Sequence, residues 1–298
     1  MVRFLISCLL IISTQAIAQS NIDSLYKIYD TRSGKEVSIA QVANAFSNAD
    51  VLFFGEEHDD SIGHILEARI FEQSHKIIGD RLVLSMEMFE ADIQGVVDEY
   101  LAGLISEKNF IKEARAWGNY KDYKPLVEYA KANSIKLIAA NTPARYANAV
   151  TRGGLSALDK FSPHTLMILP PRPIDTATGK YYENFIEIMG GHGVMPGFHI
   201  YQSQNLWDAT MAWSIFGNIH RNPKAKIMHL NSRFHTDEQL GIIAQLKKYA
   251  AKGNQSLNIL NISCFYVDSL DKPNWSEFKE LGDFVIMTKK FKKDKEEK

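Results

Sequence analysis

Acidic residues and histidines gather at one point of the sequence, directly after a short apolar run. Residues 51–54 read Val-Leu-Phe-Phe, and Gly55 follows them. The next five residues all carry a group that binds metal ions or transfers protons: Glu56, Glu57, His58, Asp59 and Asp60. Carboxylates and imidazoles are common ligands of divalent metal ions, and they also act as general acids and bases. The stretch therefore marks a candidate site for metal binding or proton transfer.

Polar side chains end three further apolar runs in the same way. These side chains are Glu87 and Glu90, Asn141 and Thr142, and Asn231 and His235. Ligands of a parallel sheet sit outside the carboxyl ends of its strands. Apolar runs that become neighbouring parallel strands would therefore bring these groups to one edge of the sheet. The candidate catalytic residues at that edge are Glu56, His58, Glu87 and His235.

Two chemistries fit this set of residues. His58, Glu87 and His235 form a candidate ligand set for Zn²⁺, Mn²⁺ or Fe²⁺, with an open position for water. A carboxylate beside that water would act as a general base. Without a metal ion, the same histidines and carboxylates would activate water directly, because burial raises the pKa of a carboxyl group. The residues leave both mechanisms open.

The remaining histidines of the central region are assigned to structural positions. His229 lies inside an apolar run, which predicts a histidine buried in the core with its hydrogen bonds satisfied. His64, His75 and His220 fall within helical patterns, where we expect them on the helix surface. None of these four is predicted to belong to the site.

The elements that must position the site are predicted from the apolar pattern. Five apolar runs with little alternation indicate strands that are covered on both faces. They are residues 51–54, 82–86, 135–140, 226–230 and 257–262. Helical patterns separate the runs, such as the apolar stripe formed by Ile62, Leu66, Ile70 and Ile77, with Asp60 or Ser61 available as its N-cap. Strands alternating with helices predict an α/β fold, a mostly parallel sheet flanked by helices.

One interval lacks this alternation. Residues 146–204 contain helical pieces, a proline-rich break and a glycine-rich run. We interpret them as a smaller all-helical insertion in an α/β domain that covers residues 19–288, with residues 166–169 as an alternative strand. Residues 289–298 are nearly all charged, which predicts a frayed tail.

The N-terminal residues have the pattern of a secretory signal peptide. Arg3 precedes an apolar run at residues 4–12, and Ala-Ile-Ala at residues 16–18 is a small-residue cleavage motif. We expect residues 1–18 to be removed as the signal peptide. The mature chain is then an exported protein, in the periplasm or associated with the outer membrane.

The composition of the mature chain excludes two classes of protein. Without residues 1–18 the chain has 33 basic side chains against 35 acidic ones, a balance that gives no electrostatic footprint for nucleic acid. Cys264 is then the single cysteine, so no disulfide framework can form. Stability must come from a hydrophobic core, and a sequence that is 45% hydrophobic can supply one.

The polar block after the first run resembles the opening motif of a known family. Gly55-Glu56-x-His58-Asp59 is similar to that motif in the ChaN-like haem-binding proteins, which lie within the Tiki/TraB/erythromycin-esterase-like superfamily. Later blocks keep the order of the same family, and the likeness runs from about residue 51 to residue 241. These blocks are residues 87–90, Trp117, residues 123–126, 140–143 and 204–212, and His235.

The resemblance implies a fold, a ligand and a mode of assembly. It implies an α/β domain with a small all-helical domain. It also implies haem binding for iron acquisition at the bacterial envelope, together with envelope iron-uptake components. A homodimer would hold haem between its subunits, with a tyrosine on the iron and a histidine supporting a propionate. In the helical insertion the candidate haem-binding residues are Tyr201, Tyr182, His199 and His192.

The sequence departs from the family pattern in one block. Residues 231–235 read Asn-Ser-Arg-Phe-His, where relatives often carry a Gly-Asn-Gly-His-like block. Fewer glycines there leave less room for a ligand to approach the backbone. Other branches of the superfamily, metal-dependent peptidases and an esterase, imply a hydrolytic use of the same strand-end residues. An exported haem-binding protein is thus the first hypothesis, and a metal-dependent hydrolase with a divalent metal ion is the alternative.

Overall fold

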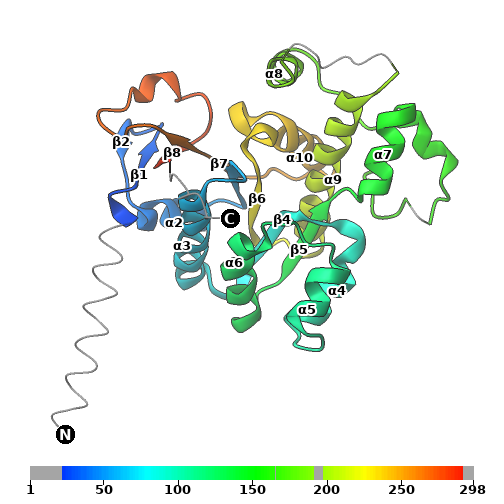
Figure 1. Cartoon of the computed structure of the whole chain (residues 1–298), viewed down its shortest axis with the longest axis horizontal. Helices are drawn as coiled ribbons and strands as arrows, with labels where there is room; N and C mark the ends of the chain where they lie inside the picture. The colour runs from blue at the N-terminus through cyan, green and yellow to red at the C-terminus, as the bar shows by residue number, and fades with distance from the viewer. Residues whose placement is uncertain (1–21, 165, 191–196, 291–298) are drawn as a thin grey trace, which may run out of the picture.

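One mixed sheet runs through the centre of the molecule (Figure 1). The computed structural model describes residues 22–164, 166–190 and 197–290. Within these residues eight strands pair in the order β2-β1-β8-β7-β3-β6-β4-β5. In chain order they are β1 (Tyr26–Asp30), β2 (Lys35–Glu36), β3 (Val51–Glu56), β4 (Leu82–Glu90), β5 (Leu137–Asn141), β6 (Lys226–Ser232), β7 (Ile259–Val267) and β8 (Phe284–Lys289). The strands from β8 to β5 are parallel, and β1 and β2 join them antiparallel. The predicted α/β fold with a mostly parallel sheet is confirmed.

The five predicted runs fall in β3, β4, β5, β6 and β7, whereas β1, β8 and the two-residue strand β2 are missing from the prediction. In the described part of the chain, the connection from β7 to β8 contains only the short helix η6 (Trp275–Glu277). The helical pattern that marks a βαβ unit is therefore absent there. In β1 only Ile28 is fully buried, so this strand lacks a continuous apolar run.

Five helices cover the first face of the sheet, which we call the α3 side. They are α2 (Ile39–Ser47), α3 (Ser61–Ile78), α4 (Gln94–Leu101), α5 (Glu107–Glu113) and α6 (Tyr120–Ala132). Alternate strand residues such as Phe54, Met86 and Leu230 pack into the core on this side. Of the two predicted N-cap candidates, Asp60 caps α3, because its carboxylate accepts a hydrogen bond from the backbone N–H of Ile62.

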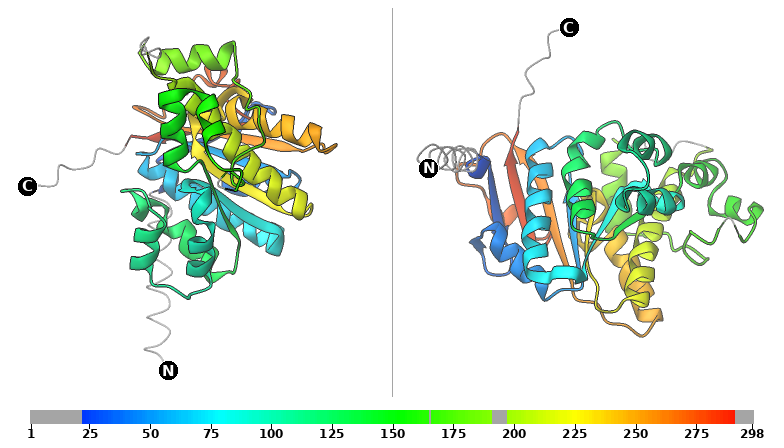
Figure 2. Two further views of the ribbon diagram at one scale, coloured as in Figure 1. Left: turned by 90° about the vertical axis from the view of Figure 1, so that its right-hand side faces the viewer. Right: turned by 90° about the horizontal axis from the view of Figure 1, so that it is seen from below.

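Two long helices cover the opposite face, which we call the α9 side (Figure 2). They are α9 (Ile200–Arg221) and α10 (Gly241–Lys252). Phe53 and Ile227 from the sheet pack against Met211 and Ile243 from these helices. Residues on several sides of α9 are buried, polar ones included. This helix therefore brings polar side chains into the interior of the protein.

The chain between β5 and α9 is made of helices and turns in its described part. It contains α7 (Ala144–Gly153) and α8 (Lys180–Ile188), and Figure 1 shows both at the outer end of α9. Tyr146 and Val150 pack against Leu206 in a small separate core. Residues 166–169 form turns, so the alternative strand there is wrong.

Short 3₁₀ helices complete the fold. They are η1 (Gly79–Arg81), η2 (Ala91–Ile93), η3 (Leu155–Lys160), η4 (Arg233–His235) and η5 (Asp237–Gln239). None of the described helices is both long and apolar enough to span a bilayer. The predicted signal peptide and most of the predicted charged tail lie outside the described residues.

Candidate functional site

The ends of β3 and β4 send their carboxylates to opposite faces of the sheet. Successive side chains of a strand alternate between the two faces. Because Phe54 packs on the α3 side, Glu56 points to that side too. Met86 also packs on the α3 side, so Glu87 points to the α9 side. The edge that sequence analysis predicted as one site therefore carries two polar networks, one on each face.

The α3-side network consists of Glu56, His64, Glu67 and Tyr123. His64 Nδ1 lies 3.1 Å from Glu56 Oε2 and 3.5 Å from Glu67 Oε2. The Tyr123 hydroxyl donates to Glu56 Oε1 at 2.7 Å. All four side chains are buried, and the two glutamates are at most 1% exposed. The network thus places two carboxylates and one imidazole nitrogen around a common buried point.

The α9-side network consists of Glu87, Asp208, His235, Gln204 and Tyr181. His235 Nδ1 lies 2.5 Å from Asp208 Oδ1, and His235 Nε2 lies 3.6 Å from Glu87 Oε1. The Tyr181 hydroxyl donates to Asp208 Oδ2 at 2.5 Å, and the Gln204 amide donates to that hydroxyl at 3.1 Å. His235 is therefore held between two carboxylates, one at each ring nitrogen.

His58 lies between the two networks and is the most accessible of the four predicted catalytic residues. Its side chain is 37% exposed, and its Nδ1 lies 2.6 Å from Glu56 Oε1. Trp117 contacts the imidazole edge to face, with ring centroids 5.0 Å apart. Burial alone would lower the pKa of His58, but the hydrogen bond with Glu56 and the negative charge of Glu87 raise it above the ordinary value.

Charges shift the pKa values in both networks. Burial opposes a charged His235, yet the charges of Glu87 and Asp208 raise its pKa to about 10. Burial would likewise raise the pKa of Glu87, but the charge of His235 and its hydrogen bond hold that pKa below the ordinary value. On the α3 side, burial and the charge of Glu56 raise the pKa of Glu67 well above its ordinary value. An imidazolium therefore pairs with a carboxylate on each side, but on the α3 side the second carboxyl group, that of Glu67, is driven toward its neutral form.

Gly55 is required where β3 passes beneath the turn that carries His235. A Cβ atom at Gly55 would lie 2.8 Å from Arg233 Cα and 3.0 Å from Thr236 Oγ1. Neither atom is the end of a long flexible side chain, so any larger residue would push η4 away from the sheet. Gly55 thus allows β3 and η4 to pack closely at this point.

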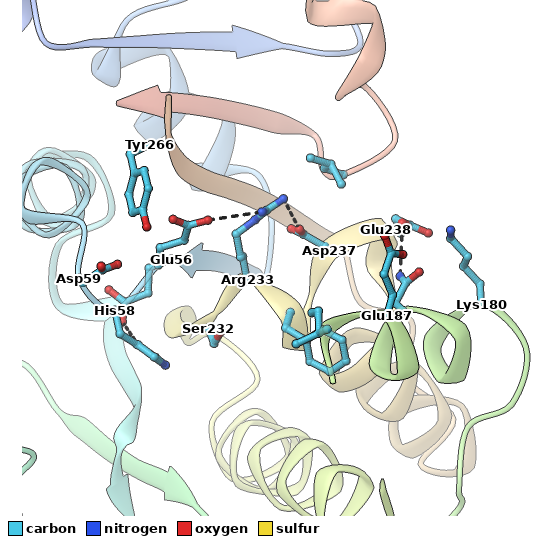
Figure 3. A pocket seen from close by; sticks show the side chains of 15 residues that line it. Glu56, His58, Asp59, Lys180, Glu187, Ser232, Arg233, Asp237, Glu238 and Tyr266 are labelled. Atoms are coloured by element: carbon cyan, nitrogen blue, oxygen red, sulfur yellow. Dashed lines mark hydrogen bonds and ion pairs between the residues drawn. The ribbon is translucent and has the colours of Figure 1, made fainter. Parts of the chain in front are cut away.

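A cavity of about 930 Å³ opens above this edge of the sheet. Its lining comes from the end of β3, from η4 and η5, and from one side of α8. Arg233 stands in the middle of the lining, 2.7 Å from Asp237 and 3.6 Å from Glu57 (Figure 3). This volume falls within the roughly 300–1,000 Å³ that is common for small-molecule sites. Glu56 and His58 are the predicted catalytic residues that reach the cavity wall.

Of the four predicted catalytic residues, the structure brings Glu87 and His235 into contact, and Glu56 and His58 into contact. The charges of His58 and Glu87 act on each other across the edge. The catalytic role of these residues stays a prediction. Among the described residues, ligand atoms converge at Glu56, His64 and Glu67 and not at the predicted metal ligands His58, Glu87 and His235.

The predictions for two other histidines had different outcomes. His64 was predicted on a helix surface, which is wrong, because α3 packs this ring against the sheet and Tyr123 at 6% exposure. His229 is fully buried as predicted. Its Nδ1 lies 2.8 Å from Ser85 Oγ, and burial lowers its pKa to about 3. In the described surroundings its Nε2 has no hydrogen-bond partner, so it is only half satisfied.

Sequence analysis did not assign several network residues to the site. They are Tyr123, Glu67, Tyr181, Gln204 and Asp208. Asp208 lies four positions after Gln204, a spacing that puts both on one face of a helix. That spacing was a usable signal, because α9 carries both side chains toward His235. His64 and Glu67 have the equivalent three-residue spacing in α3.

The predicted haem-binding residues are separated from these networks. The Tyr201 hydroxyl donates to the carbonyl of Ala177 at 2.7 Å, and its ring packs against Tyr182. Tyr182 is 38% exposed on α8, and His199 is exposed where α9 begins. His192 lies outside the described residues. The structure thus brings the two tyrosines together on the surface of the insertion.

Comparison with known proteins identifies relatives of the whole architecture. A family model described as haem-binding uptake, Tiki superfamily, ChaN matches residues 42–246. The solved structure described as cofacial heme binding to ChaN of Campylobacter jejuni is similar with a TM-score of 0.67 and 17% identity. The match covers 89% of this chain and 98% of that chain, and at this identity it establishes a shared fold.

Two further similarities are partial. The protein RETICULATA-RELATED 5, chloroplastic, of Arabidopsis thaliana is 28% identical over 123 residues, which are 38% of this chain and 16% of that protein. The chain thus spans about a sixth of the length of this curated relative. An erythromycin esterase structure, EreC, matches with a TM-score of 0.45 and 12% identity over 85% of this chain and 80% of that one, a likeness too low to bear on function.

Proposed function

The chain belongs to the ChaN family of haem-binding uptake proteins in the Tiki superfamily, and on that premise we propose that it binds haem. The observation that carries the proposal is the match of the family model to residues 42–246. The shared fold supports it, because nearly the whole Campylobacter chain, described with bound heme, aligns with this one. The chain would serve haem and iron acquisition as an exported protein that works with envelope uptake components.

The outer surface of α8 is the proposed haem surface. Two large aromatic side chains are exposed there, Tyr182 on α8 at 38% and Phe198 just before α9 at 48%. Exposed apolar side chains on one part of a protein are typical of ligand or partner surfaces. The side chains present therefore suit a flat, apolar ligand.

Tyr182 is the iron ligand that the hydrogen bonds favour. Tyrosine ligates haem iron in some proteins, and it does so as the phenolate. Tyr201 donates to a backbone carbonyl, and burial raises the pKa of its phenol to about 12. Both effects keep Tyr201 protonated. Within the described part of the chain, no hydrogen bond holds the Tyr182 hydroxyl, so it is the freer of the two to bind iron.

A second copy of the chain would complete the haem site. Lys180, Asn184 and Glu187 of α8 line the cavity, so Tyr182 points away from it by helix geometry. Haem bound at Tyr182 would therefore lie on the outside of the protein, with one face in water. A homodimer in which two α8 surfaces face each other would cover that second face. The cavity at the edge of the sheet remains available for another ligand.

Titration with hemin tests this proposal. The mature chain should give a Soret shift with a tyrosinate-type spectrum, and Tyr182→Phe should lose it. Tyr201→Phe is the matched control, because it removes the neighbouring hydroxyl and should keep the spectrum. An unchanged Soret band with the wild-type chain at every hemin excess would contradict haem binding. Loss of the spectrum in Tyr201→Phe alone would instead reassign the ligand.

A second candidate function rests on the cavity and the α9-side network. His58 lines the cavity, and His235, fixed by Asp208, faces Glu87 near it. A histidine oriented by a carboxylate is an arrangement used for proton transfer to and from substrates. Because the pKa of His235 is raised to about 10, this histidine would act as an acid at neutral pH. Hydrolysis of ester or peptide substrates that is lost in both His58→Ala and His235→Asn, but kept in His220→Asn, would support a hydrolase.

A further inference from the structure

We propose that Glu56, His64 and Glu67 bind a divalent metal ion on the α3 side of the sheet. One ligand atom from each residue lies within 4.8 Å of the other two, and all three side chains are buried. The site is distinct from the proposed haem surface on α8. It also lies on the opposite face of the sheet from Glu87 and His235.

The His64 ring is oriented with its Nδ1 atom toward the two carboxylates. Its Nε2 lies 3.2 Å from the backbone carbonyl oxygen of His58, which can only accept a hydrogen bond. The ring proton therefore sits on Nε2, and in the neutral tautomer Nδ1 holds a lone pair. That lone pair faces Glu56 Oε2 and Glu67 Oε2. A histidine whose far N–H donates to a carbonyl is the arrangement found around protein-bound metal ions.

The carboxylate oxygens supply an independent observation. Glu56 Oε2 and Glu67 Oε1 are buried, and neither has a hydrogen-bond partner in the described structure. Glu56 Oε2 stands 3.1 Å from His64 Nδ1 and still lacks hydrogen-bond geometry. Glu67 is fully buried. Buried carboxylate oxygens without donors are costly unless a cation meets them. A divalent cation bound by both carboxylates would neutralise them and offset the burial of oxygens that have no donor.

The other oxygen of Glu56 is fixed by its neighbours. Tyr123 donates to Glu56 Oε1, and His58 Nδ1 lies 2.6 Å from the same oxygen. These contacts hold the carboxylate so that its Oε2 points at His64 and Glu67. Partners of this kind orient the ligands of a metal ion and add to its affinity. Residues outside the ligand set therefore help to position the ligands.

The donor atoms indicate which metal ions fit. One imidazole nitrogen and two carboxylates suit Zn²⁺, Fe²⁺ or Mn²⁺, and the set contains no sulfur ligand that would select Cu⁺. Three protein ligands leave a coordination position for water. Glu56 and His58 line the cavity, which gives an ion and its water a path from solvent.

Protons compete with the metal ion for the same atoms. Without metal, contacts with Glu56 and Glu67 outweigh burial and raise the pKa of His64 to about 11, and burial and the charge of Glu56 raise the pKa of Glu67. A protonated ring has one N–H at Nδ1 for two carboxylates, so it satisfies them only in part. Metal binding would displace these protons, and affinity should fall as the pH is lowered.

Metal titration of the full mature chain, stripped with chelator, tests the site. With Mn²⁺, Zn²⁺ or Co²⁺ as probe, we expect one equivalent to bind. Glu67→Gln and His64→Gln should each weaken binding by at least about 100-fold, the upper end of what loss of a mere orienting partner costs. Glu72→Gln, on the same helix, is the matched control and should bind like the wild type. Glu87→Gln tests the opposite face and should also keep the ion.

Thermal unfolding separates a ligand from a structural residue. Metal should raise the Tm of the wild type, because the ion binds only the folded chain. Glu67→Gln without metal should be at least as stable as the metal-free wild type, since one of two competing carboxylates is gone, and added metal should not raise its Tm. The proposal is overturned if the wild type binds no equivalent, or if Glu87→Gln and not Glu67→Gln abolishes binding. Hemin titration of Glu67→Gln reports on the haem proposal separately.

Discussion

The two faces of the sheet edge carry the same set of groups in two different arrangements. On the α9 side, Asp208 meets His235 Nδ1 and Glu87 faces His235 Nε2. Each ring nitrogen thus has its own carboxylate, and one imidazolium serves both. On the α3 side, one nitrogen of His64 faces both carboxylates, and the other is taken by a backbone carbonyl. The orientation of one ring therefore distinguishes an ion triad from a set of metal ligands.

The remaining oxygens show the same difference. On the α9 side, Glu87 Oε2 accepts from the backbone N–H of Ser232 at 2.8 Å, and Asp208 Oδ2 accepts from Tyr181. On the α3 side, Glu67 Oε1 has no donor among the described residues. Among the described residues, no buried polar atom of the α9-side network lacks a hydrogen-bond partner, whereas the α3-side network has two such oxygens and leaves room for a ligand. Substitutions on the two faces should therefore have opposite effects on stability.

The largest effect is expected when the ion triad is broken. Asp208→Asn leaves the buried imidazolium of His235 with one carboxylate, and should lower the free energy of unfolding by about 3–5 kcal/mol. Urea denaturation measures the loss. Asp268→Asn, at an exposed position, is the control and should change it by less than about 0.5 kcal/mol. An Asp208→Asn variant as stable as the wild type would contradict the charged triad.

The pH dependence of stability gives a second and smaller effect. The pKa of His235 is raised from 6.5 to about 10 because Glu87 and Asp208 outweigh burial. A raised folded pKa means that the stabilisation is fully present below 6.5 and is lost as the pH rises toward about 10. Unfolding midpoints at both ends of this window should differ less in His235→Gln than in the wild type. Equal differences in the two proteins would remove His235 as the cause.

The connection between the faces is tested by filling the space at Gly55. Gly55→Ala places a Cβ against the backbone of Arg233 and should cost about 1–3 kcal/mol, as overpacking does. The turn that carries His235 would move, while His64 on α3 stays in place. Hydrogen exchange should therefore increase at η4 and not at α3. Equal increases at both elements would show that the two networks are not independent.

The smallest effect is expected on the α3 side and has the opposite sign. Without metal, Glu67→Gln removes one of two competing carboxylates and adds an amide donor, so it should stabilise the protein by about 1 kcal/mol. Urea denaturation in the presence of chelator measures this gain. A destabilised Glu67→Gln variant would mean that the carboxylate pair is satisfied as it stands.

Sequence patterns predicted where the strands end but not where the side chains at those ends point. The apolar runs at residues 51–54 and 82–86 located Glu56 and Glu87 at one edge. Because side chains alternate along each strand, the two glutamates point to opposite faces of the sheet. Which face each one takes depends on the face that its apolar run packs against. Tertiary packing decides these orientations, so the sequence pattern predicted one site where the structure has two networks.

The helical partners were harder to predict than the strand ends. His64 lies in a helix of mixed composition, and its burial results from packing against Tyr123, which is 59 positions away in the chain. Asp208 lies in a helix that is buried on several sides, where a polar residue gives no sign of its partner. Such contacts depend on how helices dock on the sheet, which the periodicity of a single segment does not contain.

Imidazole nitrogen resonances measured by NMR during a Zn²⁺ titration test the central difference most directly. In the metal-free protein at neutral pH, both ring nitrogens of His235 should carry protons. Addition of one equivalent of Zn²⁺ should shift Nδ1 of His64 to the range of a metal-bound nitrogen and leave His235 unchanged. A His64 ring that does not respond, or a His235 ring that loses a proton as the ion binds, would contradict the account.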